Sequence, residues 1–446
     1  MNKSEIDMTE GPVLLKLLNF SIPIIFSSVL QLLFNTADII VVGRFAGEVA
    51  LAAVGSTSSL INLLVNLFIG LSIGANVVCA HFYGARDEKQ ISETVETAMA
   101  LSLLSGFLLT VIGMIGTRII LKLMLVPDEV LPLSTVYLQF YFAGITSTMV
   151  YNFASAILRA KGDTRRPLFA LMLSGVINVI LNLIFVIFFK MSVRGVALAT
   201  VISQTIAALI VSILLMKEEG AFKLNLRKLH ISREILIKII KVGLPAGLQG
   251  IIFASSNVII QSQVNSFGSV VIAGNSASSS IEGFVYLSMN GLSQGSLTFA
   301  SQNCGAGKIS RIKKLFFVSQ ASEIVIGLLL GLSAVIFSTF LLGIYSDNPE
   351  VILSGKVRLK MICTLYTLCG LMDCTANLIR GTGHSVLPMV VTLVGACGIR
   401  LLWIFSIFQI PAFHTLTCLY LSYPVSWTIT YLVHVFCFVK IYRRMV

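Results

Sequence analysis

The chain has 446 residues, of which 56% are hydrophobic and only 12% are charged, with a formal net charge of +12. Mean hydropathy is +0.92, and apolar runs of about 20 residues, long enough to cross a bilayer, recur along the chain. This composition excludes a soluble globular fold, and the ten-residue alternating segments of a membrane β-barrel do not occur. We therefore predict an all-α polytopic membrane protein.

Twelve apolar segments follow one another, and we expect each to form a transmembrane helix. They lie near residues 14–41, 51–80, 93–117, 131–157, 167–190, 195–216, 235–264, 271–302, 315–341, 355–379, 387–409 and 416–439. The one long polar stretch divides them into two sets of six. We expect an N-terminal six-helix lobe over residues 1–216, a cytoplasmic linker over 217–233 and a C-terminal six-helix lobe over 234–446.

The distribution of Lys and Arg sets the expected orientation. If the N-terminus is cytoplasmic, the inner segments hold 23 of these residues and the outer segments hold 8, including Arg358, while Arg400 lies within a span. The positive-inside rule then places both termini in the cytoplasm of a prokaryotic plasma membrane. Because this charge faces anionic lipid head groups, we expect no nucleic acid partner. The acidic N-terminal segment does not have the pattern of a signal peptide.

The two halves repeat at a constant offset of 221 residues. Gly70-Leu-Ser-Ile-Gly74 corresponds to Gly291-Leu-Ser-Gln-Gly295, and Arg159-Ala-Lys-Gly162 corresponds to Arg380-Gly-Thr-Gly383. The alternative is that small residues recur by chance in membrane helices. Because six spans per half is an even number, the repeat predicts two bundles related by a pseudo-two-fold axis along the membrane normal, as in parallel-repeat transporters.

Asp38 is a carboxylate deep in the first span, 15 residues after Pro23. A carboxylate at mid-helix costs roughly 2.5–3.5 kcal/mol on insertion scales, so acids within spans are rare and mark functional sites. Proline removes a backbone donor and lets a helix bend. A bendable helix with a titratable group is typical of an ion-coupled transporter. The structural alternative is a hydrogen bond between Asp38 and Asn35, one turn away.

Other acids lie within the C-terminal spans. Glu282 is in the eighth span and Asp373 in the tenth, and both are candidate ligands for an ion or a substrate. An internal ion pair with Arg400 is the structural alternative for either acid. Glu323, about two turns into the ninth span, is expected to extend toward the cytoplasmic face.

Polar side chains accompany these acids. Asn178 and Asn182 share one face of the fifth span at i and i+4, and Thr200 is in the sixth. Asn257 and Gln261 are in the seventh span. The eighth span carries one polar stripe, namely Ser279, Glu282, Tyr286 and Asn290. Such a stripe lines a cavity or holds helices together, and the carboxylate within it favours the cavity.

No metal or cofactor site is expected. The eight cysteines form no CxxC pair, and the five histidines lack metal-ligand spacing. The strings HExxH and GxGD do not occur, so we do not expect an intramembrane enzyme.

The sequence resembles the multidrug and toxic compound extrusion (MATE) family. The resemblance rests on Gln31-Leu-Leu-Phe-Asn-Thr-Ala-Asp-Ile-Ile-Val-Val-Gly-Arg44, on Leu51-Ala-Ala-Val-Gly55, on Leu158-Arg-Ala-Lys-Gly-Asp-Thr-Arg-Arg-Pro167, and on Leu378-Ile-Arg-Gly-Thr-Gly383, and it covers essentially the whole chain. It implies a twelve-helix secondary antiporter that expels organic cations and amphipathic drugs by alternating access.

The resemblance also implies residue roles. Asp38 matches the acid of the family's first helix, and Pro23 matches the proline at which that helix bends. Asn178 and Thr200 match the polar residues that accompany the acid. Asn182 stands where related members have a second Asp, which argues against sodium. Asp373 matches an acidic position of many bacterial members.

We therefore expect a monomeric antiporter in the lipid bilayer that exports small organic cations and drugs. Its coupling ion is expected to be the proton, with sodium as the alternative. The ion-coupling residues would be Asp38, Asn178, Asn182 and Thr200, and Glu282, Asp373, Tyr286, Asn257, Gln261 and Arg400 would serve the substrate or ion in the C-terminal lobe. A lipid-linked-precursor flippase of the same superfamily is the alternative, and it would need a groove rich in Arg and Lys.

Overall fold

In the computed structural model, residues 5–124 and 126–446 are described, and within this part the chain forms helices and no strands. The chain divides into two compact units. Unit 1 comprises the residues up to Asp7 together with Phe26–Gly247, and unit 2 comprises Met8–Ile25 and Leu248–Val446. The division falls inside two long helices, shortly after the proline that each contains, Pro23 and Pro245. The lobe boundaries expected from the sequence, at residues 216 and 234, stay a prediction.

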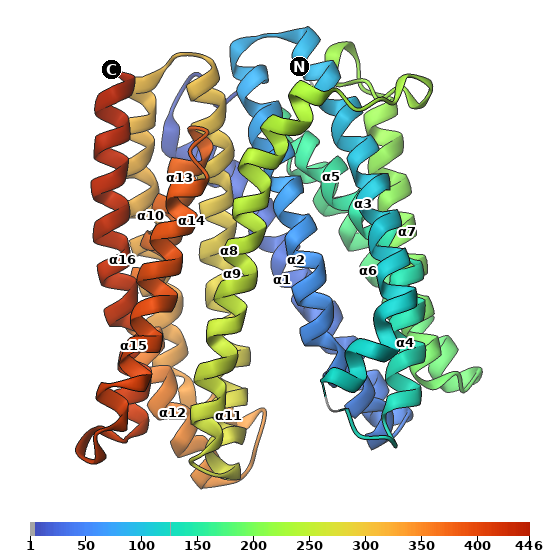
Figure 1. Ribbon diagram of the computed structural model, residues 1–446, viewed down its shortest axis with the longest axis vertical. Coiled ribbons are helices and arrows are strands. Elements are labelled where there is room, and N and C mark those ends of the chain that lie inside the picture. Colours follow the sequence, from blue (N-terminus) through green and yellow to red (C-terminus); the bar gives the residue numbers. More distant parts are fainter. Residues whose placement is uncertain (1–4, 125) are drawn as a thin grey trace. The chain divides into compact units, whose positions relative to one another are not determined.

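The central helix of unit 1 is α5 (Ile145–Lys161). It packs against α2 (Glu48–Ala85), α3 (Glu88–Leu123) and α7 (Ser192–Met216) (Figure 1). The remaining elements of the first half of the chain are α1 (Val13–Phe45), α4 (Leu131–Ala143), α6 (Arg165–Leu183) and the π-helix η1 (Ile184–Phe188). Two short 3₁₀ turns follow, η2 (Gly220–Phe222) and η3 (Leu226–Lys228).

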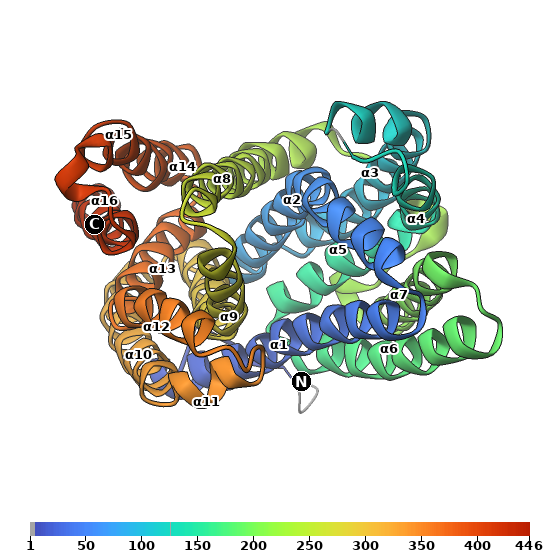
Figure 2. The ribbon, with the colours of Figure 1, turned by 90° about the horizontal axis from the view of Figure 1, so that it is seen from below.

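Unit 2 is built around helix α9 (Ser269–Gly305) and helix α13 (Thr367–Gly381), which pack on each other. Figure 2 views the helices end on and shows α9 and α13 beside α10 (Ile309–Ile336) and α12 (Pro349–Cys363). The other elements of the second half of the chain are α8 (Arg233–Asn265), which belongs to unit 1 up to Gly247, and α11 (Ser338–Gly343), α14 (Val386–Thr392), the π-helix η4 (Leu393–Gly398), α15 (Ile399–Phe405), the 3₁₀ turns η5 (Ile407–Gln409) and η6 (Pro411–Phe413), and α16 (Leu416–Met445).

The predicted all-α membrane fold is confirmed. In the described chain, nine helices are long and apolar enough to cross a membrane, and the bent pair α12 and α13 makes ten. The polar α9 and the interrupted pair α4 and α5 complete the twelve expected spans. The fourth and tenth spans are each broken, at Gly144 and at residues 364–366, where the sequence pattern predicts single helices.

The internal repeat is present in the backbone. Helices α8, α9, α10 and α14 begin 220 or 221 residues after α1, α2, α3 and α6, respectively. Gly47 and Gly268 precede α2 and α9 with φ of 89° and 95°, and Gly162 and Gly383 follow α5 and α13 with φ of 102° and 89°. A left-handed conformation at matched positions requires glycine in both halves.

The repeated glycine motif permits close helix packing. A Cβ atom on Gly70 would lie 2.4 Å from the backbone nitrogen of Gly247, so α2 and α8 touch backbone to backbone within unit 1. In unit 2, a Cβ on Gly291 would lie 2.5 Å from Ile25, and one on Gly295 would lie 2.1 Å from the Ser21 hydroxyl. Small residues at i and i+4 therefore serve helix contact in both halves.

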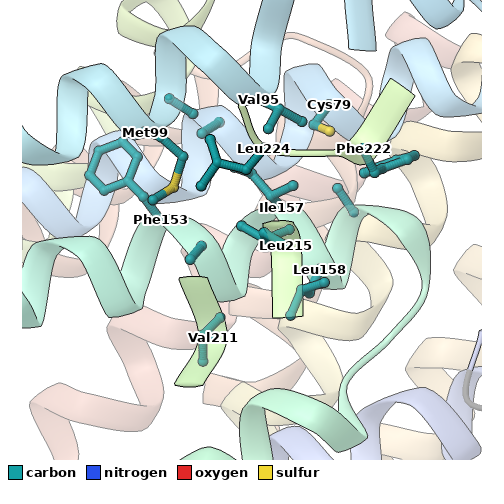
Figure 3. Packing of buried hydrophobic residues seen from close by; sticks show 14 of the residues in the cluster. Cys79, Val95, Met99, Phe153, Ile157, Leu158, Val211, Leu215, Phe222 and Leu224 are labelled. Carbon is teal, nitrogen blue, oxygen red and sulfur yellow. The ribbon is translucent and has the colours of Figure 1, made fainter. Parts of the chain in front are cut away.

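The segment expected to be a linker is packed onto unit 1. Figure 3 shows Phe222 and Leu224 among buried side chains that include Cys79 and Val95. The Leu224 amide donates to the Leu215 carbonyl at 3.0 Å. Because this segment buries apolar side chains, it is anchored rather than freely flexible.

An ionic cluster joins the ends of α5, α6 and α7 in unit 1. Glu218 accepts from Lys161 at 2.6 Å and pairs with Arg166 at 2.5 Å. Lys161 also pairs with Glu5 at 2.6 Å, and Arg166 with Asp163. Burial is the largest influence on the pKa of Glu218 and raises it, but the hydrogen bonds from Lys161 and Arg166 outweigh burial and hold the pKa below its ordinary value.

Candidate functional site

Asp38 on α1 is almost fully buried, with 8% of its surface exposed. Its Oδ1 accepts a hydrogen bond from the Asn182 amide of α6, and the Thr200 hydroxyl of α7 donates to Oδ2 at 3.4 Å. These partners come from other helices, whereas Asn35 on α1 is exposed. The carboxylate is thus held between three helices, and the local hydrogen bond considered from the sequence is replaced by bonds across helices.

Asn178 extends this network. Its Nδ2 donates to Thr200 at 3.4 Å, and its Oδ1 accepts from Asn182 at 3.2 Å. The i and i+4 spacing on α6 therefore places both amides on one face, as predicted. The structure brings together the four residues that the sequence suggested for ion coupling, and an α-to-π change of helix begins at Ile184, two residues after Asn182. π-helical segments frequently occur at functional sites.

Pro23 lies inside α1, two residues before the chain passes from unit 2 to unit 1. The helix is continuous through this position. A proline here leaves the carbonyl one turn earlier without its backbone donor, so it is the weakest point in the helical hydrogen-bond ladder of α1.

Glu282 in unit 2 forms a buried ion pair that the sequence did not suggest. Its Oε1 accepts from Nε of Arg358 at 2.8 Å, and its Oε2 accepts from Nη2 at 2.7 Å. The structural alternative considered for Glu282, an ion pair with Arg400, is therefore wrong. Arg358 was expected among the charges outside the membrane. It is instead buried within α12, with only 7% of its surface exposed.

Neutral side chains complete the surroundings of this pair. Asn275 accepts from Arg358 Nη1 at 2.7 Å and from the Tyr420 hydroxyl at 3.0 Å. Gln261 accepts from the Asn275 amide at 2.7 Å. A bidentate ion pair with these hydrogen bonds is a fully engaged polar cluster, and Glu282 has both oxygens occupied.

Arg400 is fully buried and is held by aromatic rings rather than by an acid. Its guanidinium carbon lies 4.4 Å from the centre of the Tyr423 ring and 5.1 Å from that of Phe253. Its Nε donates to Ser426 at 2.9 Å and Nη1 to Asn257 at 3.5 Å. No ion pair to Arg400 occurs within residues 5–124 and 126–446, so cation–π contacts compensate its charge.

Asp373 and Tyr286 form a third polar group in unit 2. The Tyr286 hydroxyl lies in hydrogen-bonding contact with the Asp373 carboxylate and with Asn290. Asp373 is half-buried. The polar stripe of α9 therefore engages α12 through Glu282 and α13 through Tyr286, while Ser279 at its far end is exposed.

Arg358 and Tyr420 belong to the polar cluster of unit 2 but were not among the residues predicted from the sequence, and the surroundings of Glu323 differ from those expected. Glu323 is completely buried and does not extend toward an aqueous face. The signal that could have found Arg358 is helical spacing, because it falls seven residues after Val351 and four before Ile362 on the buried face of α12, whereas Lys360 is exposed. In the described part of the chain, no three His, Cys, Asp or Glu side chains gather as a metal site would require.

Comparisons with known proteins agree on the family. The family model described as MatE matches this chain twice, over residues 23–184 and 245–405. Among curated proteins, the probable multidrug resistance protein YoeA of Bacillus subtilis is 28% identical over 85% of this chain and 84% of its own length. The probable multidrug resistance protein NorM of Thermotoga maritima is 24% identical over 90% of this chain and 87% of its own.

Solved structures share the fold. A structure described as the outward-facing conformation of a multidrug resistance MATE family transporter of the MOP superfamily has a TM-score of 0.92, with 20% identity, over 100% of this chain and 99% of the other. A MATE structure in complex with MaL6 has the same TM-score and coverage at 21% identity. The two family matches coincide with the two halves of the internal repeat.

Proposed function

Because the chain belongs to the MATE family of membrane transporters, we propose that it exports cationic or amphipathic organic compounds in exchange for protons. The names of the curated relatives support multidrug export as the substrate class. The Lys and Arg distribution supports a prokaryotic plasma membrane with both termini in the cytoplasm. The transporter works as a monomer.

The observation that carries this proposal is the hydrogen-bonded carboxylate in unit 1. Asp38 accepts bonds from Asn182 and Thr200 when it is ionised. When it binds a proton, it loses its charge and one of its oxygens becomes a donor, so the bonds from α6 and α7 must rearrange. The protonation state of Asp38 thereby determines how α1 is held in unit 1, and Pro23 gives α1 a place to bend.

Coupling requires that the proton and the substrate favour different states of the transporter. Mutual exclusion at one carboxylate is sufficient, because a proton and an organic cation each neutralise it and cannot do so together. Protonation of Asp38 from the outside then accompanies release of the drug, and alternating access returns the site to the cytoplasm.

Sodium is the weaker choice of coupling ion. Hard cations are bound by several oxygen ligands that include carboxylates. The network of Asp38 offers a single carboxylate, with amides at 178 and 182 and a hydroxyl at 200. A proton needs one carboxylate, so this composition favours it.

A flippase of anionic lipid precursors receives no support from Arg358 and Arg400. The charge of Arg358 is neutralised by Glu282, and that of Arg400 is covered by aromatic rings. Neither guanidinium is left to bind a pyrophosphate head group.

The test is efflux of a fluorescent organic cation in everted membrane vesicles energised by a pH gradient without sodium. Wild type should transport, and Asp38→Asn should not, at matched expression. Glu234→Gln is the control, since its side chain is 64% exposed and removes a carboxylate from the surface. Equal transport by wild type and Asp38→Asn would refute the coupling role, and transport only after sodium is added would refute the proton.

A further inference from the structure

Glu323 of α10 is a buried carboxyl group without a hydrogen-bond partner. None of its surface is exposed, and neither Oε1 nor Oε2 has a donor among the residues that the structure describes. Every other acid discussed above has at least one donor. Burying an ionised carboxylate without a partner costs several kcal/mol. The surroundings of Glu323 therefore accommodate the neutral acid, and a bound proton is the ligand that makes it neutral.

Two glycines make room for this carboxyl group within unit 2. A Cβ atom on Gly370 of α13 would lie 2.8 Å from Glu323 Oε2 and 2.8 Å from the Met289 sulfur of α9. A Cβ on Gly327, one turn after Glu323, would lie 2.6 Å from the Thr367 hydroxyl and 3.2 Å from the same sulfur. The carboxyl group thus packs where α9, α10 and α13 meet, and the Thr367 hydroxyl, which faces Gly327 one turn further along α10, also has no partner in the described residues.

These neighbours suit a proton better than a metal cation. Sodium and other hard cations require several oxygen ligands, whereas the groups that meet beside Gly370 are one carboxyl group and a thioether. A proton needs only the carboxyl oxygen itself.

Among the residues that the structure describes, the titratable groups that interact electrostatically with Glu323 lie on α13. They are Asp373, Cys369 and Cys374. The contact from α9 is Met289, which does not titrate, and Arg358 of α12 is occupied by Glu282. From α16, Tyr431 approaches Cys374 rather than the carboxyl group. Because two neighbouring carboxylates repel each other, Glu323 and Asp373 favour a state in which only one of them is ionised.

We propose that Glu323 is a second proton-binding site of this transporter, which lies in unit 2 and exchanges its proton during the transport cycle through the half-buried Asp373. The proposal rests on the proposed function, in which the proton is the coupling ion. One proton binds at Asp38 and another at Glu323. Exchange of these two protons for one monovalent cation moves net charge, so transport responds to membrane potential as well as to pH.

The first measurement is infrared spectroscopy of the purified full-length protein in lipid, because it needs no transport. The carbonyl stretch of a neutral carboxylic acid should be stronger in wild type than in Glu323→Gln at neutral pH, and this difference should diminish as the pH is raised into the alkaline range. Glu350→Gln, which removes an exposed acid, should leave the band unchanged. A band that is absent, or that persists at every pH, would overturn the proposal.

The second measurement is ethidium exchange in proteoliposomes with a potassium diffusion potential and no pH gradient. Wild type should expel ethidium faster when the vesicle interior is negative, whereas Glu323→Gln should respond to a pH gradient but not to potential. Glutamine has the shape of the neutral acid and keeps the space filled. Equal responses of the two proteins to potential would overturn the second proton site. Failure of wild type to use a pH gradient would instead refute the proposed function, and the infrared result would still decide the protonation of Glu323.

Discussion

Removing one member of the buried Glu282–Arg358 pair should destabilise the protein far more than removing both. Arg358→Met leaves the carboxylate without its two donors, which lie at 2.8 and 2.7 Å. Charges about 4 Å apart attract by about 4 kcal/mol at an effective dielectric of 20. Loss of one partner of a buried pair typically costs about 3–5 kcal/mol. The two energies agree, so we expect Arg358→Met to lower the free energy of unfolding by about 3–5 kcal/mol.

The effect of Glu282→Gln on stability should change sign when Arg358 is already replaced by Met. Replacing a buried ion pair by neutral groups of similar volume is often neutral or stabilising. Glu282→Gln introduced into Arg358→Met should therefore raise stability, although the same substitution in wild type should lower it. The hydrogen bond from Tyr420 to Asn275 involves neither substituted residue, so we expect it to persist in all three variants.

The assay is the apparent melting temperature of detergent-solubilised protein, read as the fraction that stays monodisperse after heating. Lys360→Gln on the same helix is the matched control. Because the Lys360 side chain is exposed, this variant should have the melting temperature of wild type. A double variant that melts no higher than Arg358→Met would refute the reasoning, and so would an Arg358→Met variant that melts with the control.

Three further changes test other parts of the structure. Gly70→Ala should lower the melting temperature, at a cost of about 1–3 kcal/mol for overpacking, because its Cβ would lie 2.4 Å from the Gly247 nitrogen. Gly55→Ala is the control, because its Cβ would meet no atom within 4 Å. Equal melting temperatures of the two variants would contradict the close helix contact. The depressed pKa of Glu218 stabilises the fold above the ordinary glutamate pKa of about 4.3 and ceases to do so as the pH falls through the folded value. Glu218→Gln should therefore melt below wild type at neutral pH and alongside it in acid, and a gap that does not change with pH would argue against the ion pairs. Asn182→Asp would add a second carboxylate beside that of α1, so efflux should become responsive to a sodium gradient without a pH gradient; continued indifference to sodium would count against cation binding there.

The sequence by itself determined the fold class, the twelve spans and the repeat. Apolar runs of membrane length leave the helix as the structure that satisfies its own backbone hydrogen bonds in lipid. The repeat was visible because positions such as Gly162 and Gly383 require left-handed backbone in both halves. In unit 1, the spacing of Asn178 and Asn182 predicted one helical face, since that relation is local to a single helix.

Only the tertiary structure decided how buried charges are paired. Whether a carboxylate meets a cation depends on contacts between helices that are far apart in the sequence, such as Glu282 with Arg358 across 76 residues. The Lys and Arg count placed Arg358 among the outer charges, and the position of Glu323 near the end of its span suggested a path to water, because both patterns reflect average surroundings and not the direction of a side chain. Burial then decided the outcome: the charge of Arg358 is satisfied by an acid, that of Arg400 by aromatic rings, and Glu323 has neither a cation nor a hydrogen-bond donor in the described chain.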